Sequence, residues 1–152
     1  MPGYPLDLSR SGRIKLLTDT NGDGYPDKSQ VWADSLTLPT GLMRWRNGLI
    51  VTDAPDVLYL EDTDGDGRAD QRQVLLTGFA RSNPQHNLNS PVFGPDNWVY
   101  LAHEGAITPF VYKKEFGDEG SPIRFPNRRS ESPTLLKNAD GRNVRFQPDT
   151  YQ

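Results

Sequence analysis

Apolar residues in this chain occur in short runs that are closer to a two-residue period than to a helical one. Gly, Pro, Asn and Asp bound the runs, and no window of a dozen residues avoids them long enough to hold an amphipathic helix. The runs are RIKLL, SQVWA, TGLMRW, LIVTD, DVLYLED, RQVLLTGF, PVFGPDNWVYLAH, FVYKK and VRFQPD. Short runs of this kind are typical of antiparallel strands joined by turns. The pattern therefore predicts an all-β domain.

Part of the chain repeats at an offset of 43 residues. At this offset Ile14 aligns with Val57 and Asp19 aligns with Asp62. A period of roughly 40 to 50 residues that contains about four strands is typical of one β-propeller blade. We therefore expect a partial, open β-propeller of two to three blades, each a four-stranded antiparallel sheet.

The repeat divides the chain into three units. A partial blade is expected at 13–36, one blade at 39–79 and the next blade at 89–151, with a long polar loop at 114–141. Propellers close with roughly four to eight blades. We therefore expect the chain to be one incomplete propeller domain, and part of a larger protein.

Composition narrows the classes of protein to consider. A length of 152 residues fits about one domain, and a net charge of −3 gives no general affinity for nucleic acid or anionic membranes. The chain has no Cys, which excludes disulfides and Cys-ligated zinc. No run approaches the roughly 18 apolar residues of a membrane span. The N-terminal MPGYPLDLSR also lacks the apolar region of a signal peptide.

Two acidic segments, TDTNGDGYPDKSQ and EDTDGDGRADQRQ, are the strongest candidates for chemistry. Counted from Asp62, carboxylates stand at positions 1, 3, 5 and 9, and Gly67 stands at position 6. This is the oxygen spacing of the first three quarters of an EF-hand loop, in which side chains and a carbonyl converge on calcium. The predicted ligands are Asp19, Asn21, Asp23, Asp27, Asp62, Asp64, Asp66 and Asp70.

A simpler interpretation of these segments stays open. Position 12 is Gln30 in the first loop and Gln73 in the second, where an EF-hand has Glu, and the flanking segments are predicted strands. The loops are therefore not EF-hands. Asp and Gly are also ordinary residues of solvated hairpin turns, and Asn21 replaces one carboxylate of the first loop.

The segment HNLNSPVFGPDNWVY resembles soluble PQQ-dependent sugar dehydrogenases, which are six-bladed propellers. In both, a His precedes by seven residues the apolar residue that opens a GPD turn, here His86 and Phe93. The ordered series PTGL, NGLIVTDAPDVLYLEDTDGDG, LTGF, QH and FGPDNWVY is similar to the membrane-bound dehydrogenase domain of planctomycete-type bacteria. This resemblance covers roughly 13–151 and implies a TolB-like or quinoprotein-like propeller.

Two departures from the sugar dehydrogenases leave cofactor use open. Their Gly-Asp turn is replaced here by His103, Glu104 and Gly105, and their later HRNPQG element is absent. The resemblance nevertheless implies an extracytoplasmic dehydrogenase, periplasmic or membrane-associated. It would use PQQ to oxidise a sugar or another alcohol and pass electrons to a haem partner such as a cytochrome c.

The resemblance also implies a role for His86, whose neutral imidazole would take the hydroxyl proton of the substrate. The alternative is a loop His bonded to the backbone. Two other functions remain open for the whole chain. One is a calcium-stabilised propeller module that binds carbohydrate or protein without catalysis, and the other is a non-functional fragment.

Overall fold

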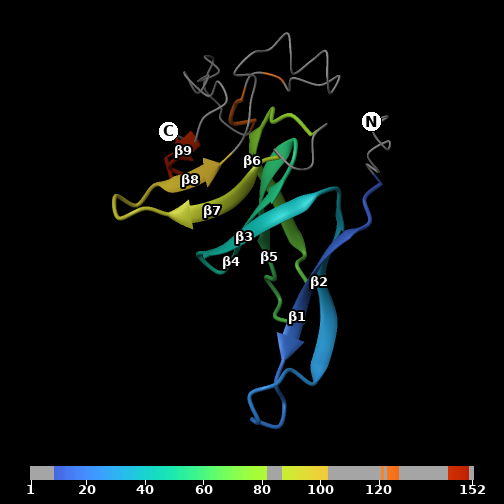
Figure 1. Cartoon of the computed structure of the whole chain (residues 1–152). Helices are drawn as coiled ribbons and strands as arrows, with labels where there is room; N and C mark the ends of the chain where they lie inside the picture. Colours follow the sequence, from blue (N-terminus) through green and yellow to red (C-terminus); the bar gives the residue numbers. More distant parts are fainter. Residues whose placement is uncertain (1–8, 82–86, 103–120, 122, 127–143, 151–152) are drawn as a thin grey trace, which may run out of the picture.

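The computed structural model describes residues 9–81, 87–102, 121, 123–126 and 144–150 (Figure 1). These residues form nine β-strands and no helix. The strands are β1 (Gly12–Thr18), β2 (Lys28–Leu36), β3 (Pro39–Trp45), β4 (Gly48–Asp53), β5 (Asp56–Glu61), β6 (Gln71–Thr77), β7 (Asn89–Phe93), β8 (Val99–Ala102) and β9 (Val144–Phe146). The described residues also contain no helix of the length and hydrophobicity needed to cross a bilayer.

The strands form three antiparallel sheets in which each strand pairs with its neighbour in the chain. Sheet A is β1-β2, sheet B is β3-β4-β5-β6 and sheet C is β7-β8-β9. None of the sheets closes into a barrel. The all-β prediction is confirmed, and the architecture is that of a partial, open propeller with one four-stranded blade between two smaller sheets.

Sheet B has apolar side chains on both faces because it packs against both neighbouring sheets. Along β5, Val57 and Tyr59 belong to a core shared with sheet C, whereas Leu58 and Leu60 belong to a core shared with sheet A. Successive side chains of a strand point to opposite faces. An unbroken apolar run such as VLYL is therefore what a blade between two others requires.

The first strands of sheets B and C lie against each other, as β3 and β7 are in contact. The Thr40 hydroxyl donates to the Leu88 carbonyl. A Cβ on Gly41 would come within 2.9 Å of the Ser90 nitrogen and 2.8 Å of the Pro91 ring. Only glycine fits so close an approach of two backbones, so Gly41 fixes where the two strands meet.

The passage from sheet A to sheet B is fixed by a buried carboxylate. Asp53, at the end of β4, accepts hydrogen bonds from the backbone N–H of Thr37 at 2.9 Å and of Leu38 at 2.6 Å. Asp53 is 6% exposed. Buried polar groups need such partners, and here they tie the turn after β2 to the next sheet.

Candidate metal centre

The second acidic loop joins β5 to β6 and wraps around the side chain of Asp62. Its two carboxylate oxygens accept from the backbone N–H of Gly65 at 2.7 Å and of Gly67 at 2.9 Å. Both glycines have positive φ, 79° and 88°. Glycine adopts this region without steric cost, so the two glycines allow the backbone to turn around one carboxylate.

The same turn brings three carboxylates together. One oxygen each of Asp62, Asp64 and Asp66 lies within 4.8 Å of the others. Asp62 is half-buried, and the other two side chains are exposed. Three negative groups so close repel one another in the absence of a cation. Oxygen atoms in such a cluster are the ligands that calcium prefers.

The first acidic loop, between β1 and β2, has nearly the same backbone hydrogen bonds. Asp19 accepts from Gly22 at 2.7 Å and from Gly24 at 2.8 Å. It differs where Asn21 replaces an Asp, because the Asn21 amide donates to Asp23 at 3.2 Å. The first loop thus has one carboxylate fewer and a hydrogen bond to one of those that remain, and the second loop is the better candidate for a cation.

The predicted ligands at position 9 have a different role in the structure. Asp70 accepts from the Thr63 backbone N–H at 2.9 Å and from its hydroxyl at 2.6 Å. Asp27 accepts from Thr20 in the same way, at 3.0 and 2.7 Å. These hydrogen bonds, that of the Thr hydroxyl first, lower the pKa of both carboxyls below the ordinary value. Neither residue is in the three-carboxylate cluster.

The pKa of Asp19 is also lowered, chiefly by the hydrogen bond from Gly24 and next by that from Gly22. The cause is general, since N–H groups that point at a carboxylate favour its charged form. The Asp19 side chain is therefore ionised at all but acidic pH.

A contact that the sequence analysis missed docks the second loop on sheet A. The Gln30 side chain donates to the Gly67 carbonyl at 2.8 Å, and the Ala69 N–H donates to the Trp32 carbonyl at 2.7 Å. Gln30 is position 12 of the first loop, so the residue that replaces the EF-hand Glu binds the next loop instead. Gln recurs at position 12 in both units, as Gln30 and Gln73, and this recurrence was the sequence signal that the position has a role.

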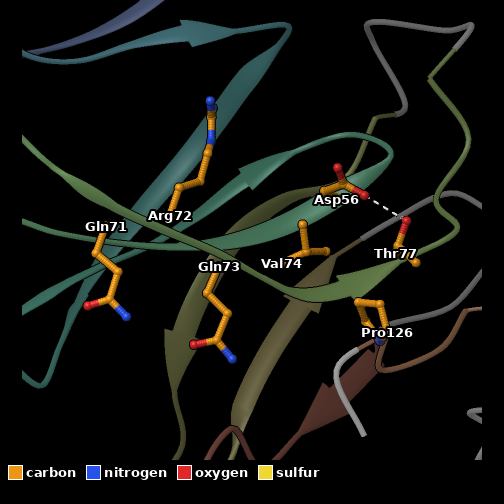
Figure 2. Close-up of a pocket in the computed structure, with 7 residues that line it drawn as sticks. All are labelled: Asp56, Gln71, Arg72, Gln73, Val74, Thr77 and Pro126. Atoms are coloured by element: carbon orange, nitrogen blue, oxygen red, sulfur yellow. Dashed lines mark hydrogen bonds between the residues drawn. The ribbon is translucent and has the colours of Figure 1, made fainter.

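Apart from the acidic loops, a shallow hollow of about 680 Å³ lies along β6 (Figure 2). Figure 2 shows Gln71 and Gln73 extending from one side of the strand and Arg72 from the other. The carboxylate in this hollow, Asp56, already accepts from the Thr77 hydroxyl at 2.6 Å. Among the described residues that line it, the hollow therefore offers no unpaired carboxylate.

The predicted catalytic residue His86 lies outside the described residues, as do His103 and Glu104. The residues that follow His86 are described: Asn87 and Leu88 are buried beside β3. The GPD turn between β7 and β8 is closed by the Gly94 N–H, which donates to the Trp98 carbonyl at 2.8 Å.

One family model matches the chain over residues 1–150, and its description is a domain of unknown function, DUF7133. No curated protein and no solved structure matches the chain. The match to the family model covers nearly the whole sequence, and the chain belongs to the DUF7133 family.

Proposed function

We propose that this chain is part of a calcium-binding β-propeller in which the second acidic loop holds the ion. The observation that carries this proposal is the cluster of Asp62, Asp64 and Asp66, with oxygens within 4.8 Å of one another. Calcium accepts six to eight oxygen ligands in flexible geometry. Backbone carbonyls and water would complete the set.

The ion would stabilise the contact between blades and would take no part in a reaction. The loop that would hold it also contacts sheet A through the Gln30–Gly67 hydrogen bond and the ion pair of Arg68 with Asp34 at 3.0 Å. Calcium would relieve the repulsion within the loop and so stabilise the contact between two blades. The first loop would be a weaker second site.

Calorimetric titration of the chelator-treated protein with calcium tests this proposal. We expect binding in the range from about 10⁻⁶ to 10⁻³ M, which spans sensor and extracellular sites. Asp64→Asn should weaken binding roughly 10- to 100-fold, as changes around metal ligands typically do. Calcium at 100 times its Kd should raise the free energy of unfolding by about 2.7 kcal/mol.

Asp149→Asn is the matched control, since it removes one exposed carboxylate that lies outside both acidic loops and pairs with Arg46 in the turn between β3 and β4. That variant should bind calcium like the original chain. The absence of any calcium uptake up to millimolar concentration, with the protein folded, would exclude the metal centre.

A second candidate function is oxidation of a sugar or other alcohol by the complete propeller. The specific observation in its favour is the contact of β3 with β7, because the first strands of adjacent blades surround the central channel of a propeller. His86 precedes β7 in the sequence, and only the resemblance to sugar dehydrogenases implies that it would act on a substrate in that channel. An extracytoplasmic address and a cytochrome c acceptor belong to this candidate.

PQQ fits the described residues poorly. The quinone carries three carboxylates and needs several cationic groups, but β3 and β7 contribute only Arg44. Three other large exposed side chains of these strands are apolar, namely Leu42, Val92 and Phe93. The described residues thus do not form a quinone site, and no step of the reaction is assigned to PQQ.

Dye-linked oxidation of sugars and alcohols by the complete protein, with and without PQQ, tests the second candidate. If His86 is the general base, His86→Ala should lower turnover by about 100- to 10,000-fold and leave calcium affinity unchanged. If the complete protein reduces no dye, the non-catalytic binding module becomes the better description. The calcium centre would survive that result.

A further inference from the structure

A hollow of about 390 Å³ lies between the start of sheet A and the second acidic loop. It is distinct from the carboxylate cluster, and its charge has the opposite sign. The residues of interest in its lining are Arg10, Ser11, Arg13, Asp34, Ser35 and Arg68.

A β-bulge builds one wall of the hollow. The register between β1 and β2 advances two residues on β1, from Gly12 to Ile14, and three residues on β2, from Leu36 to Ala33. Arg13 therefore faces two residues of β2 instead of one. Bulges of this kind redirect side chains and are frequent next to functional sites.

The two residues opposite the bulge are Asp34 and Ser35. Ser35 has a φ of 58°, a left-handed conformation that costs energy in a residue other than glycine. The Arg72 side chain donates to the Ser35 carbonyl at 3.2 Å and helps to hold it. The aligned pair in sheet B, Asp56 and Thr77, is in direct register, and the register shift of that hairpin falls later, between Val57 and Leu58.

The hollow has an excess of positive charge. Arg68 pairs with Asp34 at 3.0 Å. The side chains of Arg10 and Arg13 make no ion pair or hydrogen bond within the part of the chain that the structure describes. The lining therefore contains three guanidinium groups and one carboxylate, and two of the three guanidinium groups have their donors available for a ligand.

We propose that this hollow binds the oxyanion group of a small ligand: a carboxylate, a sulfate or a phosphate. Guanidinium groups donate two parallel hydrogen bonds to such groups, and several of them around one point favour an anion over a neutral ligand. The volume falls at the small end of ligand sites, which span roughly 300 to 1,000 Å³. It accommodates more than the anion itself, with the Ser11 and Ser35 hydroxyls beside it.

Chemical-shift titration of the isotope-labelled chain tests the proposal, after calcium and then the chelator, itself a polycarboxylate, have been removed by dialysis. The probes are sodium sulfate, sodium phosphate and sodium glucuronate, with glucose as the uncharged counterpart of glucuronate. We expect saturable shifts at Arg13 and Ser35 with at least one oxyanion and none with glucose. The probe that binds most tightly identifies the source of the oxyanion.

Variants distinguish binding of an oxyanion in the hollow from general electrostatic attraction of anions to the chain. Arg13→Gln should weaken oxyanion binding roughly tenfold, as loss of one charge-assisted hydrogen bond does, and Arg10→Gln provides a second test outside the strands. Asp34→Asn should strengthen binding severalfold because it frees Arg68. Arg44→Gln, which removes the same charge from β3, should change nothing. Equal weakening by Arg44→Gln, or no saturable shift with any oxyanion, would overturn the proposal.

Discussion

At the residue scale, each acidic loop is closed by a hydrogen-bonded pair of Thr and Asp. Thr63 donates twice to Asp70 and so lowers the pKa of that carboxyl, with the hydroxyl as the largest cause. We expect Thr63→Val to raise the pKa of Asp70 toward the ordinary value of 3.8. A carboxyl titration followed by NMR measures this change directly.

The sign of the pH effect follows from the lowered pKa. The native loop favours the charged Asp70, so its stabilising effect is fully present above the ordinary pKa and is lost as the pH falls through the lowered one. Thr63→Val should therefore make the folded chain less stable at neutral pH, and the difference should shrink in acid. Thr20→Val is the matched control, because it should shift Asp27 and leave Asp70 unchanged. A shift of both carboxyls by either variant would contradict the local cause.

The role of a residue could be predicted from the sequence when its partners lie within a few positions of it in the chain. The carboxylates of the second loop lie within a few positions of one another, so their spacing alone predicted that Asp62, Asp64 and Asp66 converge. Gln30 and Asp53 have partners 37 and 16 residues away. Their roles depend on how the sheets stack, and the recurrence of Gln at position 12 marks Gln30 without identifying its partner.

At the scale of elements, Gly67 is where the loop between β5 and β6 meets β2. A Cβ on Gly67 would overlap the Gln30 side-chain amide, whereas a Cβ on Gly65 would enter open space. Both positions have positive φ, so Gly65→Ala should cost about 1 to 2 kcal/mol of strain. Gly67→Ala should cost about 1 kcal/mol more, because Gln30 must move and its hydrogen bond is lost.

Chemical denaturation of the two variants, alone and with Gln30→Ala, measures the difference as a double-mutant cycle. In the Gln30→Ala background the two glycine substitutions should cost the same. If Gly67→Ala still costs more stability than Gly65→Ala in the Gln30→Ala background, the loop is not held on sheet A through Gln30.

The strands themselves were largely predictable, since alternation and turn residues act over a few positions. The apolar run LIVT predicted the strand β4, and the run VLYL predicted the strand β5. The bulges were not predictable, because an extra residue in one strand of a pair is defined only by the register with the other. The hollow beside Arg13 depends on such a bulge and could therefore not be predicted from the sequence.

At the scale of the whole molecule, the two outer sheets are not alike in what they bury. The hairpin of β1 and β2 extends away from the rest of the described chain (Figure 1). Leu16 and Leu17 on β1 are 43% and 57% exposed. The aligned residues of sheet B, Tyr59 and Leu60, are 5% and 2% exposed. The difference arises because sheet B packs between sheets A and C, whereas Leu16 and Leu17 belong to neither of the described core clusters. In addition, β1 pairs with β2 alone among the described residues.

A strand that exposes both its leucines and one edge is a template for pairing with another strand. We therefore expect this chain to associate as its concentration rises, through the free edge of β1. Sedimentation velocity over a range of concentrations measures that association. Leu17→Lys should weaken it, since a Lys on an edge strand resists pairing, and should cost little stability at so exposed a position.

Leu42→Lys is the control that separates the edge of β1 from apolar surface in general. Leu42 is 52% exposed, close to Leu17, but it lies on β3, which contacts β7 of the neighbouring sheet C. If the edge of β1 drives association, Leu42→Lys should associate like the original chain while Leu17→Lys does not. Equal effects of the two would point to apolar surface as the cause. A monodisperse monomer at every concentration would mean that the edge of β1 is protected within this chain, and that the arc of sheets is more complete than its described strands.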